Sequence, residues 1–286
     1  MAKYLTVPEL ADLLRIKERK VYDLAASGRV PCSRATGRLL FPEAEIRAWI
    51  ARESTGRPPP DSVPEVFLGS HDPLLDWALA QSRCGLATYF DGSLDGLSRF
   101  RAGEGVAAGL HLATPSGGWN VERVAAECHQ ENAALMGWAW RSRGLVTRRD
   151  GPGLSGLGDL RGRPVIPRQP ESGTDTLFRK MLGEAGVSVS ELSWGEVARS
   201  EIEAVQGVAE GRGEVTFGLE TLAASFGLAF VPIVEERFDL LIDRKSWFDP
   251  PMRALLGFCQ SEAFAERAAA MTGYDIAPLG QVRWNA

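Results

Sequence analysis

A run of consecutive prolines near the N-terminal end is the strongest constraint on how this sequence can fold. The stretch from Glu53 to Asp61 combines polar residues with three prolines that start at Pro58. Proline has no backbone N–H and fixes its own φ angle, so neither a helix interior nor a sheet interior accommodates such a run. A chain of 286 residues is also long for a single core. The sequence therefore predicts a small domain over residues 1–53, a semi-extended linker over residues 54–64 and a larger domain over residues 65–286.

The two parts of the chain differ in charge. Residues 1–57 contain 11 Lys and Arg and 7 Asp and Glu, a net charge of +4. The rest of the chain contains 21 basic and 30 acidic residues, a net charge of −9. Basic side chains release condensed counterions from phosphates, whereas an acidic surface repels nucleic acid. If this protein binds DNA, we expect the first part to make the contact.

The composition argues against several other classes of protein. With 44% hydrophobic and 24% charged residues, the chain is typical of a soluble globular protein. No apolar run reaches the roughly 18 residues of a membrane span, and residues 1–5 lack the apolar stretch of a secretory signal, so we expect a cytoplasmic protein with no membrane partner. The cysteines are scattered without a CxxC pair, so we expect reduced, mostly buried thiols, no metal site and no cofactor. They are Cys32, Cys84, Cys128 and Cys259.

The first domain begins with two short helical patterns. Thr6 and Glu9 form a capping box ahead of regularly spaced apolar residues, which predicts a helix over Val7–Leu14. A second helix fits Glu18–Ala26, and only three residues connect the two, as in a helix-turn-helix. We expect the second helix to bury Val21, Tyr22, Leu24 and Ala25.

The rest of this domain predicts a wing and a closing helix. Residues 30–34 and 39–42 predict a short hairpin with Gly37 in its turn, and a third helix follows from about Pro42 to Ala51. This order resembles the excisionase/MerR-type winged helix-turn-helix domain. The matching residues are Val21-Tyr22, Gly28-Arg29-Val30-Pro31, Gly37-Arg38 and Ile46-Arg47-Ala48-Trp49-Ile50.

The resemblance implies that double-stranded DNA is a partner. In such a domain the second helix enters the major groove, and its N-terminal residues reach base edges. The candidate DNA-binding residues are Lys17, Arg19 and Lys20 on this helix, with Arg34 and Arg38 on the wing. Two alternatives stay open: the charges form only a solvated face, or the domain binds a protein instead of DNA.

In the second domain, short apolar runs alternate with helical patterns. Strands are expected at residues 66–69, 86–90 and 106–110, with helices over Pro73–Ser82 and after Ser93. This alternation predicts an α/β fold with a largely parallel sheet and helices on both faces. Ligands of such sheets bind beyond the carboxyl ends of the strands, where helix N-termini offer free backbone N–H groups.

The loops at these strand ends carry small residues, hydroxyls and histidines. Small residues let backbone approach a ligand, and hydroxyls supply donors, so four such loops predict one small polar ligand held between lobes. The same hydroxyls could serve only as helix caps, and the histidines could be structural. The candidate ligand-binding residues are Ser70, His71, Gly92, Ser93, His111, Asn120, Arg168, Ser172, Gly173 and Thr174.

Residues 66–245 resemble the periplasmic-binding-protein-like substrate-binding domain of bacterial regulators and molybdopterin-associated proteins. The matching stretches include Gly69-Ser70-His71-Asp72-Pro73, Gly92-Ser93-Leu94-Asp95-Gly96-Leu97, Gly109-Leu110-His111-Leu112 and Ser172-Gly173-Thr174. The resemblance implies a two-lobed fold and an oxyanion ligand such as molybdate or tungstate. Asp175 and Ser200-Glu201 depart from the family, in which Arg and Thr-His are common at these positions. We therefore expect either a less anionic ligand or one bound by backbone N–H and hydroxyl groups.

Together these features predict a one-component transcription regulator that senses a small polar ligand and acts as a dimer. We expect no enzymatic activity, because the chain has no Gly-x-Ser-x-Gly elbow, HExxH helix or phosphate-loop lysine. Two alternatives remain: a cytoplasmic solute-binding protein, and an enzyme of molybdenum-cofactor metabolism whose first domain binds protein.

Overall fold

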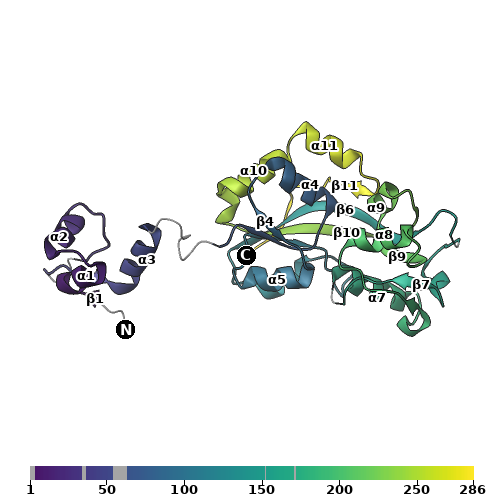
Figure 1. Cartoon of the computed structure of the whole chain (residues 1–286), viewed down its shortest axis with the longest axis horizontal. Coiled ribbons are helices and arrows are strands. Elements are labelled where there is room, and N and C mark those ends of the chain that lie inside the picture. Colours follow the sequence, from purple (N-terminus) through teal and green to yellow (C-terminus); the bar gives the residue numbers. More distant parts are fainter. Residues whose placement is uncertain (1–3, 34–36, 54–62, 152, 171) are drawn as a thin grey trace. The chain divides into compact units, whose positions relative to one another are not determined.

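The chain divides into two compact units, residues 1–62 and 63–286. The structure is a computed structural model that describes residues 4–33, 37–53, 63–151, 153–170 and 172–286 (Figure 1). Residues 54–62 of the predicted linker and the candidate DNA-binding residue Arg34 lie outside the described residues.

The first unit contains the predicted helix-turn-helix. Helix α1 spans Val7–Leu14 and helix α2 spans Glu18–Ala26, as the sequence predicts, and α3 spans Glu43–Glu53. The capping box at the start of α1 is present, since the Glu9 carboxylate accepts hydrogen bonds from the Thr6 backbone N–H at 2.7 Å and from its hydroxyl at 2.8 Å. Local sequence signals therefore set where these helices begin.

The core of the first unit is small and apolar, and it corrects one expectation. Val21 and Ala25 are buried in it, but Tyr22 is 52% exposed. Residues four apart share one face of a helix, so Tyr22 lies about a quarter of a turn or more away from the face that Val21 and Ala25 bury. The buried residues are Leu5, Val7, Leu10, Ala11, Val21, Ala25, Val30, Phe41 and Ile46.

Among the described residues of the predicted wing hairpin, the pairing is one antiparallel bridge, in which Ser33 and Leu40 exchange backbone hydrogen bonds of 2.7 and 3.0 Å. Strand β2 (Phe41–Pro42) pairs with β1 (Tyr4–Leu5) and not with residues 30–33. Phe41 is fully buried in the core beside Leu5. Burial of this ring fixes the chain after the turn against the N-terminal strand.

The second unit is built on one mixed sheet. Across the sheet, the strands lie in the order β4 (Ala87–Tyr89), β3 (Val66–Gly69), β5 (Ala107–Leu110), β10 (Ala229–Asp243), β6 (Ala133–Thr147), β9 (Val215–Leu219), β7 (Pro164–Ile166) and β8 (Ser193–Trp194). Two short strands, β11 (Tyr274–Asp275) and β12 (Val282–Asn285), also pair with β6. Pairing is parallel within β4-β3-β5 and within β9-β7-β8, but antiparallel through β10 and β6. The expectation of a largely parallel sheet is therefore wrong for its centre, because the strand–helix alternation that motivated it does not extend to these two long strands.

Strands β6 and β10 join two lobes. Each has 15 residues, so each extends about 50 Å. At one end of the pair, Asp239–Ile242 of β10 pairs with β5; at the other end, Arg143–Thr147 of β6 pairs with β9. We call the part with β3, β4 and β5 lobe A and the part with β7, β8 and β9 lobe B. Residues 138–142 of β6 and 235–238 of β10 lie between them and form the crossover segment.

Helices cover both faces of each lobe (Figure 1). Adjacent residues of a strand face opposite sides, so Phe67 and Leu68 enter two separate cores in lobe A, and Leu145 and Val146 do the same in lobe B. The helices are α4 (Pro73–Ser82), α5 (Ser93–Arg101), α6 (Val121–Cys128), α7 (Gly173–Glu184), α8 (Glu201–Ala209), α9 (Glu220–Ser225), α10 (Pro250–Phe258) and α11 (Glu262–Ala269), with short 3-10 helices at Leu157–Leu160, Val189–Glu191 and Ser246–Phe248.

Two further expectations concern the cysteines and the membrane. All four cysteines are free thiols; Cys84, Cys128 and Cys259 are buried and Cys32 is partly exposed, as predicted. Within the described ranges, no helix is both long enough and apolar enough to cross a membrane.

Candidate ligand-binding cavity

A cavity of about 140 Å³ lies where the two lobes face each other. Its wall is made by segments that follow β3, β4, β5, β7 and β8, on the carboxyl-end side of these strands. Lobe A contributes Ser70, His71, Phe90, Gly92 and His111, and lobe B contributes Arg168, Ser172, Gly173, Thr174, Arg199, Ser200 and Glu201. Eight of the ten candidate ligand-binding residues are therefore brought together; the two others, Ser93 and Asn120, do not line the cavity. That any of them contacts a ligand stays a prediction.

Ser93 lies directly behind the cavity wall. It is fully buried, its hydroxyl lies 2.8 Å from the Ser70 hydroxyl, and it accepts the backbone N–H of His111 at 3.0 Å. Ser93 therefore does not line the cavity itself but holds in place two residues that do, Ser70 and His111.

Asn120 has a different place in the fold. Its amide nitrogen donates to a carboxylate oxygen of Asp239 at 2.7 Å, and its amide oxygen accepts the Leu112 backbone N–H at 2.6 Å. The side chain is fully buried. Asn120 thus ties the loop after β5 to strand β10 and holds the lobe A wall in position.

Three helices begin at the cavity. Helices α5, α7 and α8 follow the N-cap residues Gly92, Ser172 and Ser200. The first N–H groups of a helix have no acceptor within the helix, and the helix dipole places partial positive charge at this end. At α7, the Ser172 hydroxyl accepts the N–H of Asp175 at 3.1 Å, while no described residue accepts the N–H groups of Gly173 and Thr174. Such an arrangement favours a negatively charged ligand.

The acidic residue in the wall, Glu201, is neutralised within the protein. Its carboxylate pairs with Arg143 at 3.0 Å and with Arg168 at 3.4 Å, and it accepts the Thr174 hydroxyl. Burial alone would raise the pKa of Glu201, but the two guanidinium groups outweigh burial and lower the pKa to about 2. Glu201 is therefore ionised, and its charge is balanced before any ligand enters.

The other acidic departure from the family pattern, Asp175, lies outside the wall. It is 5% exposed and accepts a hydrogen bond from Arg179 at 2.7 Å, one turn further along α7. Neither Asp175 nor Glu201 therefore presents an unpaired negative charge to the cavity. Their acidic side chains are thus no reason by themselves to expect a less anionic ligand.

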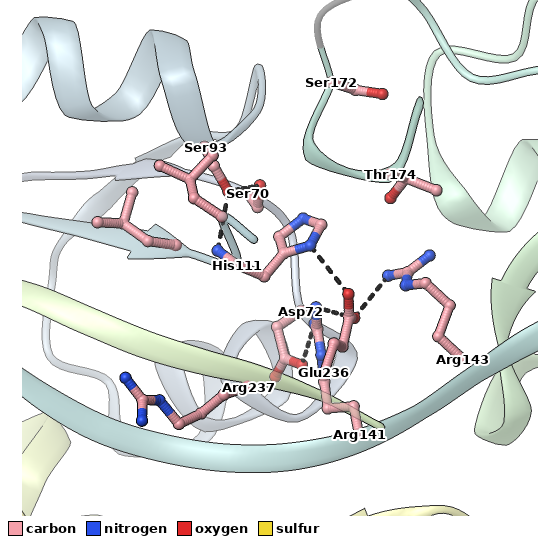
Figure 2. Close-up of polar contacts among 12 residues, drawn as sticks. Ser70, Asp72, Ser93, His111, Arg141, Arg143, Ser172, Thr174, Glu236 and Arg237 are labelled. Carbon is pink, nitrogen blue, oxygen red and sulfur yellow. Dashed lines mark hydrogen bonds and ion pairs between the residues drawn. The ribbon is translucent and has the colours of Figure 1, made fainter. Parts of the chain in front are cut away.

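A buried network of charges lies beneath the cavity, in the crossover segment. Glu236 accepts hydrogen bonds from Arg141 and from Arg143, the latter at 2.8 Å, and its second oxygen lies 3.1 Å from Nδ1 of His111 (Figure 2). Arg141 also donates to Asp72 at 2.9 Å. These side chains are almost completely buried. The network thus connects the wall of lobe A, through His111 and Asp72, to Glu201 in lobe B.

Sequence reasoning missed this network. Asp72 caps α4 by accepting the Leu75 N–H at 2.8 Å, and it also accepts from the Trp138 indole at 3.0 Å and the Tyr274 hydroxyl at 2.7 Å. The signal that could have revealed the network is the presence of charged residues inside two long apolar strands, where an unpaired charge would be very costly. Their partners lie far apart in sequence, so only the fold identifies the pairs.

A wider hollow of about 760 Å³ lies beside the cavity and shares Arg199 with it. Asp91, Leu94 and Asp95 line it from lobe A, and Gln169, Pro170, Val197 and Arg199 line it from lobe B. The Gln169 amide donates to Asp91 at 3.1 Å across the hollow, so the lobes already touch at this point.

Comparison with known protein families agrees with this architecture. Residues 77–260 match the model of the PBP superfamily domain, which is well over half of the chain. The chain belongs to the PBP superfamily. Residues 4–54 match a helix-turn-helix domain, so a PBP-like domain is fused here to a DNA-binding type of domain.

The chain is also similar to individual known proteins. Uncharacterized protein YvgK of Bacillus subtilis is 22% identical over 299 aligned positions, which cover 97% of this chain and 96% of that protein. A putative phosphate ABC transporter substrate-binding protein with bound phosphate from Clostridium perfringens is 12% identical, with a TM-score of 0.51 over 71% of this chain and 96% of that chain. A histidine kinase sensor domain with similarity to periplasmic binding proteins is 17% identical, with a TM-score of 0.46 over 73% of this chain and 96% of that one.

In the helix-turn-helix domain that precedes the PBP domain, the candidate DNA-binding side chains are accessible. Lys17, Arg19 and Lys20 are exposed at the N-terminal end of α2, and Arg38 is exposed after the turn. Glu18 is exposed among them. The structure therefore leaves these cations free to meet phosphates, and their role in DNA binding stays a prediction.

Proposed function

We propose that this protein is a ligand-responsive transcription regulator, in which the helix-turn-helix domain binds double-stranded DNA and the PBP domain binds a small oxyanion in the 140 Å³ cavity. The observation that carries the proposal is the convergence of three helix N-termini, from both lobes, on one cavity in a chain that also has a helix-turn-helix domain. The DNA-binding domain implies that the ligand is met in the cytoplasm.

The size and charge of the cavity support a small anion. A water molecule occupies about 30 Å³ in the liquid, so 140 Å³ holds a ligand of roughly five heavy atoms. The cations Arg168 and Arg199 line the wall, and the only wall carboxylate within the described residues, Glu201, is already paired. Molybdate and tungstate, which the sequence resemblance suggests, are tetrahedral ions of this size.

Ligand binding acts on DNA through a change in the angle between the lobes. A ligand held by both walls stabilises the closed arrangement, and the lobes bend at the crossover segment, where the paired strands β6 and β10 connect them. We propose that the protein is a dimer and that closure changes how its two helix-turn-helix domains are presented to two half-sites. Binding alone accounts for this function, without catalysis.

The test compares two glycines of the same helix. A Cβ atom on Gly173 would lie 2.8 Å from the His111 ring, whereas one on Gly183 would meet nothing within 4 Å. Gly183→Ala adds the same methyl group to the same helix without such a contact, so it is the control. At about 100 times its dissociation constant, a ligand stabilises the protein by about 2.7 kcal/mol, a rise in Tm of about 5–11 °C.

We expect at least one oxyanion of a panel to raise the Tm of the wild-type protein and of Gly183→Ala but not of Gly173→Ala. The same oxyanion should change the affinity for a duplex from the protein's own promoter region, measured by fluorescence anisotropy. Absence of stabilisation by every oxyanion, or duplex binding that does not weaken with salt, would contradict the proposal.

A further inference from the structure

The His111 ring is held in one orientation. Its Nδ1 lies 3.1 Å from the Glu236 carboxylate, and its face stacks on Phe238 with ring centroids 6.0 Å apart and an interplanar angle of 20°. On another side it abuts Gly173 so closely that a Cβ there would be 2.8 Å from Nε2. The ring therefore cannot turn to exchange its two nitrogens without breaking these contacts.

Glu236 decides which nitrogen carries the proton. The carboxylate receives hydrogen bonds from two guanidinium groups, those of Arg141 and Arg143, and an ionised carboxylate only accepts. Burial would raise the pKa of Glu236, but Arg141 and Arg143 hold it well below its usual range. Nδ1 of His111 must therefore donate to Glu236, so the proton of the neutral imidazole is on Nδ1.

The second ring nitrogen of His111 is then a bare acceptor at the cavity. His111 lines the cavity, and no residue in the described part of the chain donates a hydrogen bond to Nε2. Figure 2 shows the ring on the side of the gap opposite Ser172 and Thr174. Burial lowers the pKa of His111, with Glu236 acting in the opposite direction, so the ring stays neutral at neutral pH and Nε2 keeps its lone pair.

Among the remaining wall groups, His71 also has a ring nitrogen, Nδ1, without a hydrogen-bond partner, but no carboxylate at hydrogen-bond distance fixes its tautomer, since Asp76 lies 3.9 Å from its Nε2. The hydroxyls of Ser70, Ser172 and Thr174 can rotate, and the free backbone groups at the start of α7 are donors. The Glu201 oxygens are taken by Arg143, Arg168 and Thr174. A ligand oxygen next to Nε2 therefore either is protonated and donates a hydrogen bond to Nε2, or is deprotonated, so that its lone pair is repelled by the lone pair of Nε2.

We propose that the cavity selects an oxyanion that retains a proton at neutral pH, of the hydrogen phosphate type, which donates its O–H to Nε2 of His111. The proposal rests on the function proposed above and names the class of its ligand. Sulfate, molybdate and tungstate are fully deprotonated at neutral pH, so each would leave two acceptors face to face in a buried site. A missing hydrogen bond to a charged partner weakens binding about 10- to 100-fold.

The test measures dissociation constants by isothermal titration calorimetry at neutral pH and constant ionic strength. The probes are phosphate and arsenate on one side and sulfate, molybdate and tungstate on the other. We expect the wild-type protein to bind phosphate and arsenate at least about 10-fold more tightly than the other three. In His111→Gln, the side-chain amide can rotate to offer a donor, so the preference should fall below about 3-fold.

Each outcome decides the proposal. Equal or tighter binding of sulfate or molybdate by the wild-type protein overturns it and leaves the oxyanion-sensing function standing. Failure of all five probes to bind overturns both.

A second measurement uses the wild-type protein alone, so it does not require that any variant folds. The chain has only three histidines, His71, His111 and His129, so their imidazole nitrogens can be assigned by ¹⁵N NMR. We expect His111 to show a protonated Nδ1 and a bare Nε2, and the Nε2 resonance to shift on addition of phosphate. A proton on Nε2 in the free protein would refute the selection mechanism.

Discussion

Replacement of Glu236 by glutamine tests whether the buried charge network stabilises the PBP domain. Glutamine has nearly the same shape as glutamate, so the substitution removes the charge without leaving a cavity. Glu236 is fully buried and pairs with Arg141 and Arg143. In the variant, Arg141 keeps only Asp72, and Arg143 shares Glu201 with Arg168, so three guanidinium groups face two carboxylates and one positive charge is left uncompensated.

The expected effect is large. Removal of one partner from a buried ion pair costs about 3–5 kcal/mol, a substantial share of the 5–15 kcal/mol that is typical of a folded protein. For a domain of this size, that corresponds to a fall in Tm of about 6–20 °C. As a control, Glu191→Gln removes a pair with Arg161 in which both side chains are more than 40% exposed, so it should lower the Tm far less than Glu236→Gln does.

The assay is urea unfolding followed by tryptophan fluorescence, which reports mainly on the PBP domain because seven of the eight tryptophans follow residue 63. The folded-state pKa of Glu236 lies well below its ordinary value, so the stabilisation is present above about pH 4 and is lost as the pH falls through the folded pKa. The gap between wild type and Glu236→Gln should therefore narrow in acid. Similar unfolding midpoints for Glu236→Gln and Glu191→Gln at neutral pH would refute the reasoning.

Two further predictions concern the exposed cations and the thiols. Arg19→Ala and Lys20→Ala should each weaken duplex binding, while the affinity of the PBP domain for inorganic phosphate stays unchanged. If the side chain contacts a DNA phosphate, its loss should also reduce the slope of log affinity against log salt by about 1, which titrations at several salt concentrations measure. An unaltered duplex affinity would count against α2 as the recognition helix. A disulfide reagent at neutral pH should modify Cys32 first, because burial raises the pKa of Cys128 to about 11 and of Cys259 to about 12. Peptide mapping identifies the modified thiol. Rapid modification of Cys128 or Cys259 in the folded protein would contradict their burial.

Local signals in the sequence predicted much of the fold. The bounds of α1, α2 and α4 follow from caps, prolines and apolar spacing, all of which act within a few residues. Tyr22 departs from the prediction because the helical period turns it away from the face that its neighbour Val21 buries. The antiparallel centre of the sheet could not be predicted, because the pairing of β6 with β10 joins segments about 95 residues apart in sequence.

The candidate site was predicted in part for the same reason. Ser70, His111 and Gly173 follow strands or begin helices, where ligands of α/β proteins bind, and the cavity brings them together. The tautomer of His111 depends on Glu236, whose distance in sequence hides the contact. Residues that touch a cavity can thus be predicted from loop chemistry, whereas the residues that set their protonation need the fold.

The order of the lobes along the chain has a consequence for biosynthesis. Lobe B is a single continuous insertion between the long strands, but the core of lobe A packs Phe67 and Leu74 against Met252 and Phe264, from opposite ends of the unit. On a translating ribosome, the helix-turn-helix domain and lobe B are complete before lobe A can close its core. On the function proposed above, a stalled or prematurely terminated chain would thus carry a complete helix-turn-helix domain without a complete ligand-binding domain, and would bind DNA without responding to the ligand.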